Sequence, residues 1–141
     1  MISRGKRVET AVSVYPKFKE LFLGFAEELK NKPPKEGFYK IVVEEINETL
    51  IKLTVFDNII EISLSIAYLE DKTIGKMTFE QLLREDEYKL IGFIFFDMNG
   101  DILKFPDNYT EFHSIPSIFR VESIVIELLD QFIRQSSPII I

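Results

Sequence analysis

Two runs of strictly alternating apolar and polar residues, 51–55 and 60–66, constrain the fold of this chain more than any other feature. The first run alternates Ile, Leu and Val with Lys and Thr, and the second alternates Ile and Leu with Glu and Ser. Successive side chains of a β-strand point to opposite faces, so each run predicts a strand with one buried face. We expect the two strands to pair as an antiparallel hairpin.

The connection between the two runs also predicts their register. If Asp57 and Asn58 form a two-residue turn, Leu53 faces Ile62 and every apolar pair falls on one face. The polar residues then share the other face. This pattern is typical of a sheet with one face packed on a core and the other exposed to solvent.

The stretch 88–105 predicts a second hairpin at the centre of the fold. Asn99-Gly100 supplies two residues that readily adopt positive φ, as a type I′ turn requires. This turn places Phe96 opposite Leu103. Because residues 90–96 are apolar on both faces, we expect an interior strand with cover on each side.

Two long helices are predicted, one near each end of the chain. The first begins at Pro16, since proline suits the first helical turn, and it ends before Pro33-Pro34. The second covers 117–135, where apolar residues occupy more than half of the helical wheel. So wide a stripe predicts contact with both the sheet and the first helix.

Three further segments complete the prediction. Residues 1–13 show no convincing period, and we expect them to be mobile. Residues 38–46 predict a strand, but two sets of apolar residues compete for its inward face. After a polar connection, Thr78 and Gln81 form a capping box that predicts a short helix ending in the charged run 84–87.

These elements predict an α+β fold in a single domain, 1–141. The expected architecture is an antiparallel sheet of about five strands, with the two long helices packed on one face and one short connecting helix. A chain of 141 residues can bury a core of its own without disulfides or metals.

Composition narrows the classes of function. The chain has no cysteine and one histidine, which excludes disulfides, thiol catalysis and sites built on several imidazoles. It has no hydrophobic export signal and no run of 18 apolar residues, so we expect a cytoplasmic protein that does not bind membranes. The net charge is −6, with a balance of +4 over residues 1–40 and −10 over residues 41–141. So acidic a body argues against nucleic-acid binding.

Three motifs resemble chemical sites, and none is complete. Asp97-x-Asn99-x-Asp101 has the spacing of a calcium loop but lacks the glycine and the final glutamate. Glu87-x-Lys89 matches only two residues of a nuclease pattern. His113 lies beside Ser114, but no nucleophile elbow presents a serine. We therefore predict no catalytic residue, no metal and no cofactor.

The acidic residues give the one functional hypothesis that remains. In a three-stranded meander over 38–69, acids at two strand ends converge on one edge, and the run 85–87 is a further candidate for that edge. Clustered charges of one sign repel one another, and a cationic partner relieves that repulsion. The predicted partner-binding residues are Glu44, Glu45, Glu48, Glu70 and Asp71.

We therefore expect a small acidic protein-binding module, in the manner of an immunity, antitoxin or inhibitor protein, that docks a basic protein partner. One alternative is an assembly subunit that self-associates through apolar surface, suggested by the tail 139–141; the protein is then a homodimer rather than a monomer. Another is an enzyme of small substrates. Binding that weakens steeply with salt favours the acidic module, whereas a salt-insensitive oligomer favours the subunit.

Overall fold

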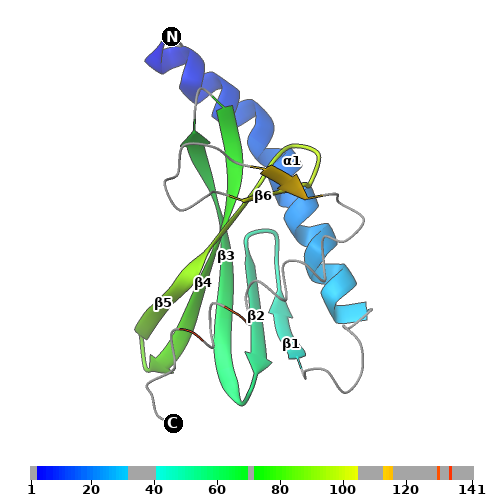
Figure 1. Ribbon diagram of the computed structural model, residues 1–141, viewed down its shortest axis with the longest axis vertical. Coiled ribbons are helices and arrows are strands. Elements are labelled where there is room, and N and C mark those ends of the chain that lie inside the picture. The colour runs from blue at the N-terminus through cyan, green and yellow to red at the C-terminus, as the bar shows by residue number, and fades with distance from the viewer. Residues whose placement is uncertain are drawn as a thin grey trace.

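The computed structural model describes residues 3–31, 41–69, 72–104, 113–115, 130 and 134. Within them, one amino-terminal helix packs against one face of an antiparallel sheet whose strands follow chain order (Figure 1). The elements are α1 (Arg4–Asn31), β1 (Ile41–Ile46), β2 (Leu50–Val55), β3 (Asn58–Leu69), β4 (Lys72–Arg84), β5 (Glu87–Phe96), β6 (Ile102–Lys104) and β7 (His113–Ile115).

This arrangement confirms the predicted α+β class and the antiparallel sheet. Five strands have six residues or more, and β6 and β7 have three residues each. The structure describes one long helix instead of the two that were predicted. Of the second predicted helix, over 117–135, only Asp130 and Arg134 lie within the described residues; both are helical and form an ion pair of 2.8 Å.

The helix α1 begins twelve residues before the predicted start at Pro16, and it includes residues 4–13, for which the sequence shows no convincing period. The expected mobility of this segment stays a prediction. Ser3 explains the early start, because its hydroxyl accepts a 3.2 Å bond from the Lys6 N–H and its carbonyl accepts one of 3.0 Å from Arg7. Pro16 has no N–H to donate within the helix. It lies on the exposed side, where water can reach the carbonyl that it leaves unbonded.

The hairpin of β2 and β3 has the predicted faces but a different register. Its two-residue turn is Phe56-Asp57, with φ of 50° and 63°, so Leu53 pairs with Ile60 and not with Ile62. Asn58 belongs to the strand, because its amide donates to the Phe56 carbonyl (2.7 Å) and its side-chain oxygen accepts from Gln81 (2.9 Å). A shift of two residues keeps every side chain on its face, so the buried set was still predicted correctly.

The hairpin of β5 and β6 differs from its prediction by one residue. Its loop has three residues, because the Asp97 N–H bonds the Asp101 carbonyl (3.0 Å) and the Gly100 N–H bonds the Asp97 carbonyl (3.0 Å). Gly100 takes the left-handed conformation (φ 84°), as a type I turn with a bulge requires. Phe96 therefore pairs with Ile102, and the predicted pairing with Leu103 was wrong.

The predicted short helix from Thr78 is also wrong, because these residues belong to β4. That strand pairs with β3 from Ile59↔Leu82 to Leu69↔Lys72 and pairs with β5 along its other edge. Gly75, Met77 and Phe79 are buried and alternate along the strand, and the neighbouring Ile74 is buried as well. Ladder bonds on both sides outweigh the local preference of a capping box, which needs a helix to follow it.

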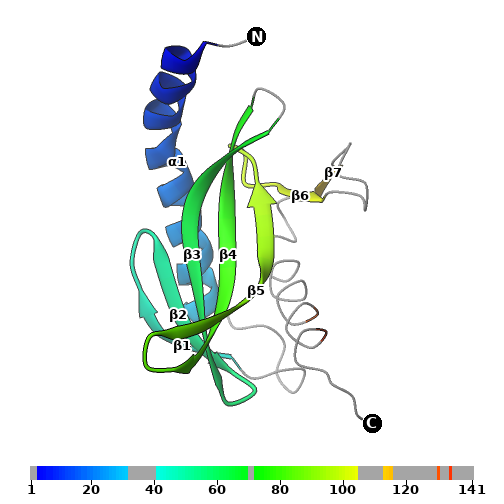
Figure 2. The same cartoon turned by 90° about the vertical axis from the view of Figure 1, so that its left-hand side faces the viewer.

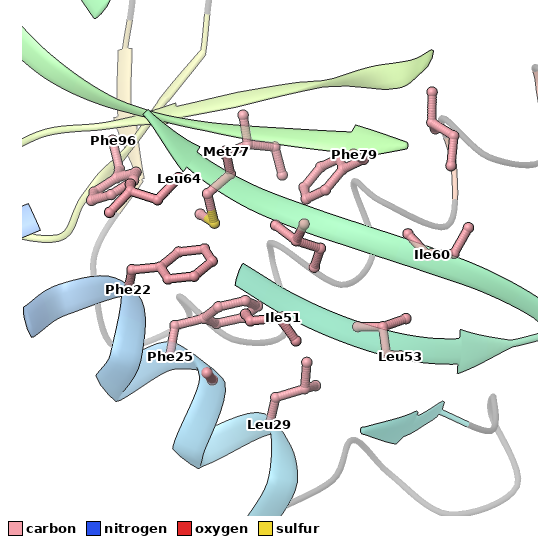
Figure 3. Close-up of a cluster of buried hydrophobic side chains, with 14 of the residues drawn as sticks. Phe22, Phe25, Leu29, Ile51, Leu53, Ile60, Leu64, Met77, Phe79 and Phe96 are labelled. Atoms are coloured by element: carbon pink, nitrogen blue, oxygen red, sulfur yellow. The ribbon is translucent and has the colours of Figure 1, made fainter. Parts of the chain in front are cut away.

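The core lies between α1 and the face of the sheet that α1 covers, which we call the inner face (Figures 2 and 3). Phe18 meets Phe96 edge to face, with ring centroids 5.5 Å apart. In β1 a bulge at Glu44 brings Ile46 to the side of Ile41 and Val43, which settles the inward face that the sequence left open. The fully buried large side chains are Phe18, Phe22, Phe25, Phe79, Ile51, Leu53, Ile60, Ile62 and Val55.

Candidate functional site

The structure describes three of the five predicted partner-binding acids, and each lies beside a polar or cationic group. Glu44 accepts a 3.2 Å hydrogen bond from the Thr54 hydroxyl. Glu45 pairs with Lys52 across the ladder, and Glu48 lies 3.9 Å from the ammonium of Lys19. These neighbours offset part of the negative charge at this edge. Glu70 and Asp71 lie outside the described residues.

The ends of the strands do not converge as the sequence suggested. Leu50, the first residue of β2, pairs with Ser63, and β3 continues to Leu69 beyond that pair. Six further residues carry the end of β3 roughly 20 Å past the turn at 47–49. Glu85 and Asp86 form the turn between β4 and β5, and Glu87 is the first residue of β5. This turn lies at the opposite end of the sheet, so the run 85–87 does not join the predicted edge.

Instead, the structure brings acids together in the middle of the face that α1 leaves uncovered, which we call the outer face. One row of register partners crosses the five long strands as Glu45, Lys52, Glu61, Glu80 and Leu90. Lys52 stands between two of the glutamates, whereas the register neighbours of Glu80 are Glu61 and Leu90. Like charges directly opposite on neighbouring strands repel. We call Glu45, Glu61 and Glu80 the acidic row.

The acidic row raises the pKa of Tyr88. Its hydroxyl donates a 3.1 Å hydrogen bond to the Glu61 carboxylate. This bond favours the neutral phenol and raises the pKa of Tyr88 above its ordinary value of 10.0; loss of hydration and the charges of Glu61, Asp86 and Glu80 add to the shift. The outer face is therefore negative around this ring.

Exposed apolar side chains adjoin the acidic row on β5. Tyr88, Leu90 and Phe93 are 42, 48 and 38 % exposed, and their register partners on β4 share the face of Glu80. We call these three residues the apolar stripe. The Lys76 ammonium lies 4.0 Å from the centroid of the Phe93 ring, a cation–π contact at the border of the stripe.

The sequence contained half of the signal for the acidic row. Glu61 stands in the alternating run 60–66, whose polar residues were expected to face outward. Glu80 fell in a predicted helix, so its position opposite Glu61 was missed. Recognition of β4 as a strand would have placed Lys76, Thr78 and Glu80 on one face, because they recur with a period of two.

The three motifs considered for chemistry do not form sites within the described residues. The Asp97 carboxylate accepts hydrogen bonds from the Asn99 and Asp101 N–H groups (2.9 and 3.0 Å), which closes the loop on itself. Glu87 pairs with Arg84 at 3.5 Å. His113 and Ser114 are adjacent residues of β7. In the described ranges no three His, Cys, Asp or Glu residues gather to hold a metal.

No known family model, curated protein or solved structure matches this chain. Among the residues that the structure describes, no helix is long and apolar enough to cross a bilayer. The function therefore has to be inferred from the geometry of the outer face.

Proposed function

We propose that this protein is a small protein-binding module that docks a basic protein partner on its outer face. The observation that supports this proposal is the direct opposition of Glu61 and Glu80 on neighbouring strands. Such a pair costs stability in the free protein. A cationic side chain placed between the two carboxylates removes their repulsion. The removal of this repulsion then contributes to the free energy of binding.

The apolar stripe supplies the second part of the docking surface. Interfaces take most of their energy from a few aromatic, aliphatic and arginine side chains surrounded by polar groups. Leu90 belongs to the same register row as Glu80, and Tyr88 bonds Glu61, so apolar area and negative charge adjoin. An arginine-rich patch with neighbouring apolar residues is the surface that fits.

The proposed mechanism is steric occlusion, in the manner of immunity, antitoxin or inhibitor proteins. A partner whose anion-binding surface is covered by the acidic row cannot bind its own anionic ligand. The net charge of −6 steers a basic partner toward encounter and makes the association rate fall with salt. We further propose that the module acts in the cytoplasm, because proteins of that compartment do not depend on disulfides and this chain has no cysteine.

The proposed site meets the predicted edge at Glu45 and extends from there across the sheet. Glu44 and Glu48 border it on β1 and on the turn that follows, where Thr54 and Lys19 hold them. We therefore propose that Glu61 and Glu80 form the centre of the contact, with Glu44, Glu45 and Glu48 at its rim.

Affinity capture with charge-matched variants tests this function. The wild-type protein is immobilised, exposed to a lysate of its native organism at low salt and eluted with a salt gradient, and the eluted protein is then purified for kinetics. We expect Glu61→Gln with Glu80→Gln to slow its association and to flatten the salt dependence. The control, Glu20→Gln with Glu27→Gln, removes two exposed charges from α1. Equal kinetics for the two variants would overturn the proposal.

A further inference from the structure

The amino-terminal segment of α1, residues 4–12, is an exposed surface that the core does not use. In Figures 1 and 2 the first turns of the helix extend past the end of the sheet. The buried residues of α1 begin only at Phe18. Val8 and Val12 are 59 and 70 % exposed, which makes Val12 the most exposed of the large apolar side chains in the described residues.

This segment is cationic and apolar on the same surface. It carries Arg4, Lys6 and Arg7 against the single acid Glu9. Val8 stands four residues after Arg4 and four before Val12, so the arginine and both valines follow one another along one face of the helix. The Arg7 guanidinium stacks on the Tyr68 ring, 4.7 Å from its centroid, which fixes this segment beside the end of β3.

The outer face offers the complementary surface. Its acidic row is negative where the segment is positive, and its apolar stripe is exposed where the segment presents valines. We propose that the amino-terminal segment of α1 of one copy docks on the outer face of a second copy. Val8 and Val12 then pack on the apolar stripe, and Arg4 faces Glu61 and Glu80.

The contact has to join two copies, because α1 covers the inner face and the acidic row lies on the outer face. Residues 4–12 span only about 14 Å as a helix and are continuous with the packed part of α1. Two different surfaces meet, so the association is head-to-tail and produces a closed ring or an open chain. Since the same outer face is used, this inference rests on the proposed function for the location of the docking surface. Self-association then competes with the basic partner.

Two complementary variants of the full chain test the head-to-tail contact. The helix variant carries Arg4→Glu and Val12→Glu, and the face variant carries Glu80→Lys and Leu90→Ser. Lys17→Glu, an exposed charge reversal in α1 outside the segment, is the matched control. Circular dichroism and thermal unfolding establish that each variant folds, and sedimentation velocity over a wide concentration range gives the mass.

We expect the wild type and the control to grow in mass with concentration and to shrink with added salt. Each variant alone has lost one of the two surfaces and stays monomeric. An equal mixture of the two variants retains one intact surface of each kind, so it forms a heterodimer and nothing larger. A wild type that stays monomeric throughout, a helix variant that associates like the wild type, or a mixture that stays monomeric would each overturn the inference.

The result also separates this inference from the proposed function. If the wild type is monomeric while Glu61→Gln with Glu80→Gln still slows association with the basic partner, only self-association fails. If that double variant binds the partner like the wild type while the mixture of helix and face variants forms its heterodimer, the docking of a basic protein fails and the contact between copies stands.

Discussion

The ring of Phe96 lies directly over the backbone of Gly75, its register partner on β4, so closely that a Cβ built on Gly75 would come within 2.4 Å of the Phe96 Cζ. No real side chain fits at that distance. The ring cannot withdraw easily, because it is 3 % exposed and meets Phe18 edge to face. Glycine in the middle of this strand is thus explained by the aromatic ring that covers it.

Gly75→Ala should therefore destabilise the protein. Overpacking of this kind costs about 1–3 kcal/mol in the free energy of unfolding, measured by chemical denaturation. Gly24→Ala is the matched control, since nothing lies within 4 Å of a Cβ at that position of α1. It should stabilise the helix by up to about 1 kcal/mol. Equal effects of the two substitutions would show that Phe96 does not occupy the space above Gly75.

Removal of the ring gives the second prediction. Phe96→Ala should cost about 3–5 kcal/mol, the usual range for emptying a buried aromatic site. In the double variant with Gly75→Ala, the added methyl group no longer meets a ring, so its own cost should fall close to zero. Additive costs in this double-mutant cycle, or a loss below about 1 kcal/mol for Phe96→Ala, would contradict the packing described.

Thr73 gives a prediction of the opposite sign. Its hydroxyl oxygen is buried, and within the part of the chain that the structure describes it has no hydrogen-bond partner. Thr73→Val keeps the shape of the side chain and removes the polar atom, so the free energy of unfolding should stay equal or rise by up to about 1 kcal/mol. Thr54→Val is the control, because it makes the same substitution at a threonine whose hydroxyl does donate a hydrogen bond, to Glu44. A destabilised Thr73→Val would reveal a bond that the hydroxyl makes.

The titration of Tyr88 gives a measurement of the negative charge of the acidic row. Because its pKa in the folded protein is raised above 10.0, the folded state holds this proton more tightly than the unfolded state. The resulting stability is present below pH 10 and is lost as the pH rises through the raised value. Tyrosinate absorbance, with Tyr88→Phe to identify the signal, should show Tyr88 titrating late, and Glu61→Gln should lower its pKa. A Glu61→Gln titration identical to that of the wild type would contradict the bond.

The three described acids of the originally predicted edge give the last variant. Replacing Glu44, Glu45 and Glu48 by glutamine should change the free energy of unfolding by no more than about 0.5 kcal/mol, because all three are exposed. Binding to the basic partner should weaken less than with Glu61→Gln and Glu80→Gln. A larger effect of the triple variant would move the centre of the site back to β1.

The sequence predicted which residues are buried better than it predicted which residues pair. The alternation of 51–55 and 60–66 determines faces, and a shift of two residues leaves faces unchanged. The true turn depends on an aromatic residue, Phe56, in the left-handed region and on Gln81, which bonds Asn58 from 23 residues further along the chain. No local pattern signals either of these.

The misassigned segment around Thr78 had a larger consequence, because it hid the candidate site. A capping box and the charged run 84–87 indicate a helix locally, and Gly75 interrupts the alternation that would have indicated a strand. The strand becomes recognisable only when the side chain of Phe96 is known to fill the place of the missing one. Glu61 lies on β3 and Glu80 on β4, and only the pairing of these two strands brings them together.

The most direct test of the central claim is the NMR signal of the Tyr88 ring while the purified basic partner is added. The signal is assigned by its loss in Tyr88→Phe, and the protein is labelled on tyrosine. If the partner docks on the acidic row, the Tyr88 signal should shift or broaden in proportion to the bound fraction. The signal of Tyr15, which packs against the core from α1, should stay in place. A saturated complex in which the Tyr88 signal is unchanged would contradict the account.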